Sequence, residues 1–258
     1  MASGWSRVAL GILLTLAMAC RVTPPGAIDS ELASCVPPEA RLLAGAHLDQ
    51  VRANPALQIV TAGWIALLEP ARDASTVLVA YSGSDLLWAA RGQFRTAPAG
   101  ATLLNPQLAI AGPPALVHAA AAQHTAGRTG APALLAQAEA VARQPIWAAA
   151  AGSALLPTSG NAINLTRLLG FTDYTTLALD TAAQINLHLN AICSSAERAR
   201  QFEESLRGLL SLARGTSRDR DLASVLSAVQ IRRDDLTVKV EVSAAPELVA
   251  RMLQGVAR

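Results

Sequence analysis

The chain has 258 residues, enough for one large domain or two small ones; 52% are hydrophobic and 16% charged. Its formal net charge is +2 and no basic cluster stands out, which argues against a nucleic-acid partner. Aromatic residues make up only 3%, which disfavours base-stacking platforms and aromatic sugar clamps. The mean hydropathy of +0.32 is raised by an apolar N-terminal segment and therefore does not indicate a membrane protein. We predict a globular protein.

The N-terminal segment predicts export. Arg7 precedes an apolar run over residues 8–18, and the small residues Ala17-Met18-Ala19 stand directly before Cys20. A positive charge, an apolar core and small residues follow one another in this order in a cleavable secretory signal. The apolar run is shorter than the about 20 residues of a membrane-spanning helix, so an uncleaved anchor is the less favoured alternative.

Two cleavage reactions compete at the bond before Cys20. Ordinary signal peptidase accepts Ala-x-Ala and would yield a plainly secreted protein, whereas a cysteine after a small residue is typical of the bacterial lipobox and predicts lipidation of Cys20. The lipobox has leucine three positions before the cysteine, but here Ala17 is found there and Leu16 lies one position further out. We predict a signal peptide over residues 1–19 and a tether over residues 20–40.

The cysteines allow a disulfide. If Cys20 carries lipid, Cys35 and Cys193 remain, and the oxidising cell envelope favours a bond between them. The alternative is two unpaired, buried thiols that pack as small apolar residues. Because no cysteine or histidine stands at ligand spacing from another, we predict no metal site and no cofactor.

The first half is predicted to span residues 41–123. A strand over 41–47 is followed by a short helix capped by Asp49 and by a helix from Pro55 to about residue 68, which Pro70 ends. Two hairpins and a helix from Pro113 to about residue 123 come next, the hairpins being formed by strands 76–81 with 86–95 and 101–104 with 107–111. Residues 124–144 are predicted to form a linker and connecting helix.

The second half, residues 145–258, repeats this order of strand, helix, hairpin, hairpin, helix. Its predicted elements are strand 145–151, helix 161–169, strands 174–180 and 183–193, a long helix over 195–214, strands 227–232 and 236–242, and a helix from Pro246 to about residue 253. The long helix has no counterpart in the first half. Because the element order recurs while residue identity between the halves is slight, we predict an internal duplication.

Alternating residues show how the second half packs. In strand 183–193 the apolar Ile185 and Leu187 alternate with the polar Asn186 and His188. One face of the strand is therefore predicted to be exposed to solvent and the other to be buried. The apolar stripe of the long helix is suited to cover the apolar face of the strands. A capping box, Ser194-Ser195-Ala196-Glu197, is typical of a helix start, and Gly215 is typical of a helix end. We predict an α+β fold of two related halves, each an antiparallel sheet with helices packed on one face.

The search for catalytic residues yields one candidate. Of the histidines at positions 47, 118, 124 and 188, His188 stands on the polar face of a strand with Asp180 across the hairpin turn. The ordinary interpretation of this face is the solvated side of a sheet. No nucleophile elbow, phosphate-binding loop or calcium loop is present in the sequence, so we predict no catalytic residues.

The pattern of Arg7, the apolar run and Ala19-Cys20, followed by a mature start such as residues 41–49, resembles that of bacterial exported proteins of the lipoprotein kind. The resemblance covers the N-terminus, implies a cell-envelope location on the periplasmic side, and carries no activity. We therefore predict a binding or structural module that is either lipid-anchored or secreted. If Cys20 carries lipid, the protein is attached to the membrane through it. The alternatives are an envelope hydrolase that uses His188 and a carrier with an enclosed apolar pocket.

Overall fold

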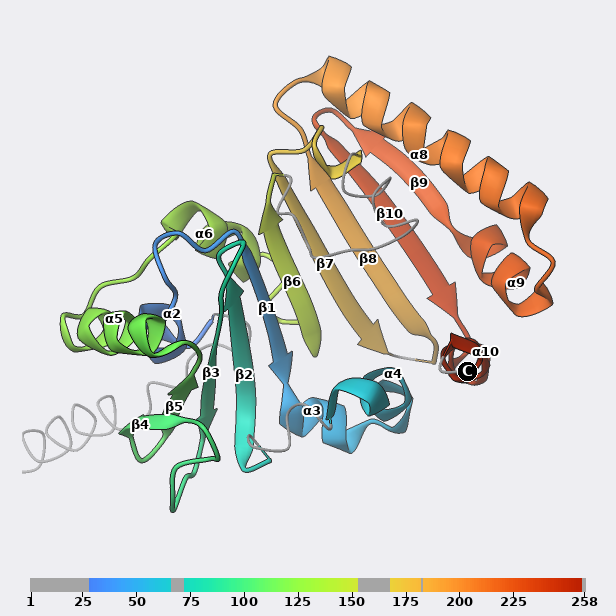
Figure 1. Cartoon of the computed structure of the whole chain (residues 1–258). Helices are drawn as coiled ribbons and strands as arrows, with labels where there is room; N and C mark the ends of the chain where they lie inside the picture. The colour runs from blue at the N-terminus through green and yellow to red at the C-terminus, as the bar shows by residue number, and fades with distance from the viewer. Residues whose placement is uncertain (1–27, 66–71, 153–167, 182, 257–258) are drawn as a thin grey trace, which may run out of the picture.

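The computed structural model describes residues 28–65, 72–152, 168–181 and 183–256. They form one sheet of ten strands in the order β4-β5-β3-β2-β1-β6-β7-β8-β10-β9, with helices packed on it (Figure 1). Every neighbouring pair is antiparallel. The α+β class is confirmed, but the prediction of one sheet per half is wrong, because a single sheet runs through both halves.

The strands agree closely with those predicted. They are β1 (Leu42–His47), β2 (Ala74–Tyr81), β3 (Leu86–Gly92), β4 (Thr102–Asn105), β5 (Leu108–Ala111), β6 (Ile146–Ala151), β7 (Tyr174–Thr181), β8 (Ile185–Ile192), β9 (Gln230–Asp234) and β10 (Thr237–Ala244). The halves join where β1 pairs with β6, from Leu42 opposite Ala150 to Ala46 opposite Ile146. Outward from this junction both halves follow the order first, second, third, fifth, fourth strand. The shared order agrees with the predicted duplication, which itself stays a prediction.

The described helices are α2 (Ser30–Ser34), α3 (Leu48–Ala53), α4 (Pro55–Ile65), α5 (Pro114–Thr125), α6 (Pro132–Glu139), α8 (Ala196–Thr216), α9 (Arg220–Ala228) and α10 (Pro246–Val256). None that lies within the described ranges is both long and apolar enough to cross a bilayer.

The strand register assigns side chains to two faces, because residues opposite each other in neighbouring strands point to the same side. We call face 1 the side of Leu43, Leu78, Trp147 and His188, and face 2 the opposite side. On face 1 of the first half, strand side chains pack with α2, α5 and α6 in one core cluster, which includes Leu32, Leu43, Leu78, Ile110, Leu134 and Trp147. Apolar side chains at alternate strand positions thus build the core of this half.

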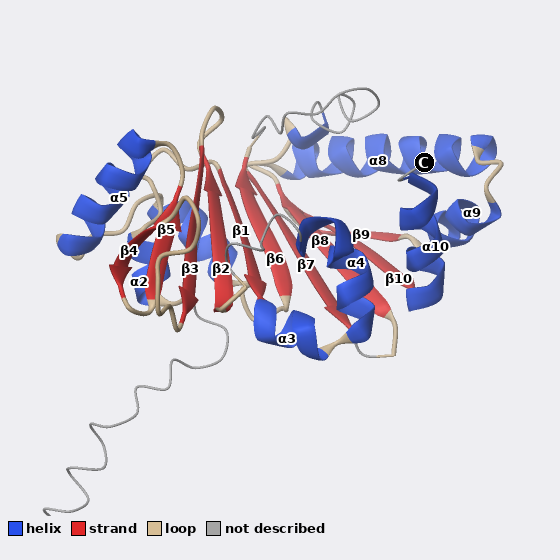
Figure 2. Cartoon of the chain, turned by 60° about the horizontal axis from the view of Figure 1, so that its bottom comes forward, coloured by secondary structure: helices blue, strands red, loops and turns tan. Residues whose placement is uncertain are grey.

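The second half is covered on face 2. Phe202 and Leu206 of α8 pack with Val238 and Ile231, and α4 and α10 pack beside Leu179 and Ile185 at the other end of the strands. Face 1 of this half carries polar side chains, among them Thr176, Asp180, Asn186, His188, Asn190, Lys239 and Glu241. Figure 2 shows α5 and α8 over opposite ends of the sheet. The long helix therefore covers the face that the alternation predicted to be apolar.

Several helix ends differ from the prediction. The helix α3 begins at Leu48, and its N-cap His47 makes no side-chain capping bond, so Asp49 is not the cap. The cap of α8 is Ser195, whose hydroxyl accepts from the Arg198 amide, and the helix continues past Gly215 to Thr216. The predicted helix 161–169 lies largely outside the described residues.

Two short helices were missed. The carboxylate of Asp29 accepts from the amides of Glu31 and Leu32 and begins α2, within the stretch predicted to be a tether. Asp219 accepts from two amides in the same way and begins α9, which lies between the predicted long helix and the strand predicted over residues 227–232 and overlaps the start of that strand. In both cases the aspartate N-cap was the available signal. The predicted linker also contributes to the core, since Leu134 and Ala138 of α6 are buried.

Candidate functional site

His188 and Asp180 meet on face 1 of the second half, as the sequence predicted. His188 Nε2 lies 3.3 Å from Asp180 Oδ2, and the two side chains are 40% and 29% exposed. Asn186 donates a hydrogen bond of 2.8 Å to Asp180 Oδ1, and the Ser243 hydroxyl donates one of 2.8 Å to Asn186. The four side chains form a chain of contacts across β7, β8 and β10.

Among the described residues, these contacts do not include the bond between a nucleophile and a histidine base that a nucleophilic hydrolase requires. A serine nucleophile must lie within hydrogen-bond reach of its histidine base. Here the Ser243 hydroxyl donates to Asn186, while the described partner of His188 is Asp180. Among the described residues, Asp180 orients the imidazole and no hydroxyl is hydrogen-bonded to it.

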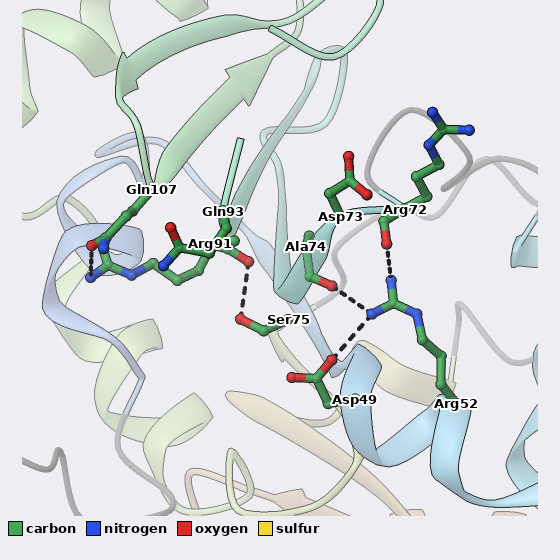
Figure 3. A pocket seen from close by; sticks show the side chains of 10 residues that line it. Asp49, Arg52, Arg72, Asp73, Ala74, Ser75, Arg91, Gln93 and Gln107 are labelled. Carbon is green, nitrogen blue, oxygen red and sulfur yellow. Dashed lines mark hydrogen bonds and ion pairs between the residues drawn. The ribbon is translucent and has the colours of Figure 1, made fainter. Parts of the chain in front are cut away.

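A polar pocket of about 470 Å³ lies where β2 begins and β3 ends, beside α3 (Figure 3). Its walls come from α3, the turn before β2, the two strands and the turn before β5. The lining residues are Asp49, Arg52, Arg72, Asp73, Ala74, Ser75, Arg91, Gly92, Gln93 and Gln107. These charged and amide groups suit a polar ligand and do not fit the enclosed apolar pocket of the carrier alternative.

Three described hydrogen bonds hold the Arg52 side chain in this pocket. Its guanidinium donates to the carbonyl oxygens of Ala74, at 2.8 Å, and Arg72, at 2.6 Å, and to Asp49 Oδ1 at 3.2 Å (Figure 3). Two of these acceptors are backbone groups of the turn into β2. The contacts hold α3 against the start of β2 and fix the plane of the guanidinium.

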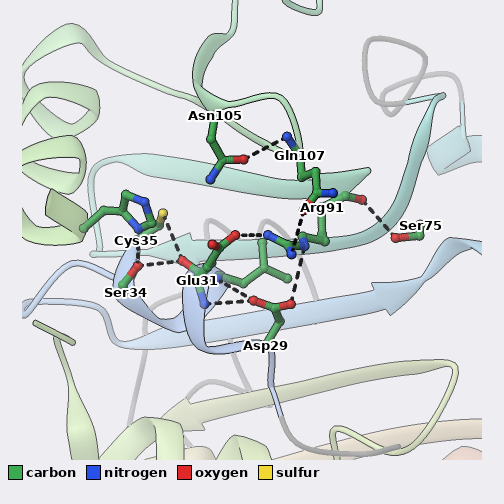
Figure 4. A network of polar contacts seen from close by, with 10 residues as sticks. Asp29, Glu31, Ser34, Cys35, Ser75, Arg91, Asn105 and Gln107 are labelled. Atoms are coloured by element: carbon green, nitrogen blue, oxygen red, sulfur yellow. Dashed lines mark hydrogen bonds and ion pairs between the residues drawn. The ribbon is translucent and has the colours of Figure 1, made fainter. Parts of the chain in front are cut away.

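Arg91 joins the N-terminal helix α2 to the sheet. Its guanidinium forms ion pairs with Glu31 and Asp29, the latter at 3.5 Å, and donates a hydrogen bond of 3.1 Å to Gln107 (Figure 4). Two carboxylates compensate the charge of Arg91, whereas Arg52 faces one carboxylate and two neutral carbonyls. No local sequence signal predicts this network, because Arg91 is about 60 residues from Asp29 and Glu31.

Helix α5 holds the same N-terminal segment from the other side. The Gln123 amide donates bonds of 2.7 Å to the carbonyls of Ser34 and Val36, and His124 Nδ1 lies 2.7 Å from Ser34 Oγ. Leu32 and Val36 of the segment are 1% exposed. Residues 29–36, predicted to belong to a tether, are therefore part of the folded core.

The predicted disulfide is absent. Cys35 and Cys193 are free, buried thiols that belong to different core clusters, one in each half. Burial raises the pKa of Cys35 to about 11, against a smaller lowering by Ser34, and burial also raises the pKa of Cys193. The alternative of two unpaired thiols agrees with the structure. Cys20, the predicted lipidation site, lies outside the described residues.

Two further histidines contact groups that are distant in the sequence. His47 Nε2 lies 2.8 Å from the carbonyl of Ala142, and His124 contacts the hydroxyl of Ser34. Within the described ranges, no three histidine, cysteine or acidic side chains gather closely enough to hold a metal ion.

Comparison with known proteins gives a fold and no family. No family model matches the chain, and no curated protein matches it. Among solved structures, crystal form III of TP0453 has a TM-score of 0.54 at 10% identity, with 89% of this chain and 99% of that chain covered. Crystal form I of TP0453 has a TM-score of 0.51 at 10% identity, with 89% and 98% covered. The chain is thus similar in fold to TP0453 over nearly the whole length of that protein.

Proposed function

We propose that this chain is an exported cell-envelope protein, held at the membrane by lipid on Cys20, that acts by binding. The observation that carries the proposal is the order of Arg7, the apolar run and Ala17-Met18-Ala19 before Cys20. The described residues support binding in place of catalysis, because the pocket near Arg52 is polar while His188 holds no hydroxyl or thiol among its described contacts. Secretion without lipid is the alternative form of the proposal.

The start of the fold sets the length of the proposed tether. Asp29 already caps α2 and pairs with Arg91, and it follows Cys20 by nine residues. A fully extended chain of this length spans at most about 30 Å. Lipid on Cys20 would therefore keep the sheet close to the membrane surface, within reach of partners there.

Cell fractionation of a Cys20→Ser variant tests the proposal. We expect the wild-type protein in the membrane fraction and the variant outside it, because serine cannot receive the thioether-linked lipid. Cys193→Ala is the matched control: it removes a buried thiol and should leave the membrane fraction unchanged. A cleaved wild-type chain in the soluble envelope fraction would support secretion without lipid. A full-length wild-type chain in the cytosol would overturn the proposal.

A further inference from the structure

The pocket beside α3 contains a guanidinium that is fixed in place and only partly compensated. Three described bonds hold Arg52, while an arginine side chain has five N–H donors. Two of its acceptors, the carbonyls of Ala74 and Arg72, are neutral. Its described ionic partner, Asp49, has a side chain that is 72% exposed. An exposed pair of this kind contributes at most about 1 kcal/mol, so another anion can replace Asp49 at little cost.

The surrounding groups favour a ligand that carries an oxyanion. A planar guanidinium presents two parallel N–H groups to a carboxylate or phosphate and binds it with defined geometry. The side chains of Gln93 and Gln107 line the same pocket and add neutral amide groups. Arg91 on the opposite wall is already paired with Asp29 and Glu31, whereas Arg52 faces one exposed carboxylate, which favours Arg52 over Arg91 as the anchor. The volume of about 470 Å³ accommodates a small organic molecule.

We infer that this pocket binds a small ligand through a carboxylate or phosphate group, which displaces Asp49 from the Arg52 guanidinium. The inference rests on the proposed binding function and names the ligand class. It is independent of export, because the binding is measured on purified protein. A failure to bind would contradict ligand binding in this pocket, and the location of the protein would still be determined by the fractionation.

Calorimetric titration of the purified protein with succinate and with inorganic phosphate tests the inference at low ionic strength. We expect one of the two probes to bind the wild type, and the stronger one assigns the ligand as carboxylate or phosphate. Arg52→Gln should weaken binding at least tenfold, because the anchoring cation is lost. Asp49→Asn should tighten binding about two- to fivefold, because the competing carboxylate is lost.

Asp85→Asn is the matched control for Asp49→Asn. It removes the same charge from the tip of the β2–β3 hairpin, where Asp85 accepts from Ser84 outside the pocket. Its affinity should equal that of the wild type. Binding of neither probe would overturn the inference, as would equal effects of the two aspartate variants or unchanged binding by a folded Arg52→Gln protein. If Arg52→Gln does not fold, the two aspartate variants decide the result.

Discussion

The two halves of the sheet follow the same strand order but differ in the face that most of their helices cover. In the first half, face 1 is apolar and packs with α2, α5 and α6. In the second half, face 1 carries His188, Asn186 and Asn190, and α8 packs on face 2. The junction of β1 with β6 makes one sheet of both. The alternation of apolar and polar residues along a strand, more than the order of the strands, therefore determines where the helices pack.

The largest loss of stability is expected in the core of the second half, where α8 packs on face 2. Phe202 of α8 is 2% exposed and packs on face 2, so Phe202→Ala should lower the free energy of unfolding by about 3–5 kcal/mol. Urea unfolding measures the change. Leu212→Ala on the same helix is the control, because Leu212 is 64% exposed and its loss should cost less than about 0.5 kcal/mol. Equal losses would contradict the packing of α8.

The second expected effect tests the junction of the halves. A Cβ atom at Gly45 of β1 would lie 2.2 Å from the Trp147 ring of β6, so Gly45→Ala requires the ring to move. Overpacking of this kind should lower the free energy of unfolding by about 1–3 kcal/mol, measured by urea unfolding. Gly208→Ala in α8 should instead raise it by up to about 1 kcal/mol, because nothing lies within 4 Å and alanine favours the helix. A neutral Gly45→Ala would contradict the close approach of β1 and β6.

The third expected effect concerns the cover of the first half. Arg91→Met leaves Asp29 and Glu31 without their cation and weakens the hold on α2. Because the pairs are partly exposed, we expect a loss of about 1–2 kcal/mol and faster proteolysis before residue 40. The exposed Arg95, four residues along the chain, provides the control Arg95→Met, which should change neither quantity. If Arg91→Met were cleaved before residue 40 at the wild-type rate, Arg91 would not hold this segment against the sheet.

The smallest loss of stability is expected at Glu203 of α8, and it depends on pH. Burial alone would raise the pKa of Glu203, but hydrogen bonds from Arg207 and Arg233 outweigh it, so the pKa lies below the ordinary 4.5. A lowered folded-state pKa contributes stability above pH 4.5, and this is lost as the pH falls through the folded value. Glu203→Gln should therefore remove less than about 1 kcal/mol near neutrality and flatten the acid limb of unfolding.

The control for this pH dependence is Glu204→Gln, whose carboxylate contacts Arg200 on the outer side of α8. It removes the same charge one residue along the helix and should change the acid limb less. The same acid limb for both variants would show that the Arg233 contact with Glu203 does not link α8 to β9.

Periodicity was sufficient to predict the strands but not their assembly. Alternation located β8 and the polar side of His188, and the apolar stripe located α8. The joining of both halves through β1 and β6 depends on pairing between residues about 100 positions apart, for which a single sequence carries no local signal. Thus the strands could be found from the sequence while the number of sheets could not.

The candidate sites show the same limit. The contact of His188 with Asp180 crosses one hairpin turn and was predicted from it. The pocket around Arg52 combines α3 with the β2–β3 end and the turn before β5, and the Arg91 network combines α2 with β3. The pairing of Cys35 with Cys193 was predicted from the number of cysteines and the oxidising cell envelope, neither of which determines the distance between them. Sites built from distant segments therefore required the structure.

Intact mass spectrometry of protein purified from the membrane fraction is the decisive measurement for lipid attachment at Cys20. We expect a polypeptide that starts at Cys20, carries the added mass of lipid on this residue, and shows no loss of mass for a bond between Cys35 and Cys193. A mass that corresponds to a chain starting at Met1 or Ala2, with no added lipid, would contradict it.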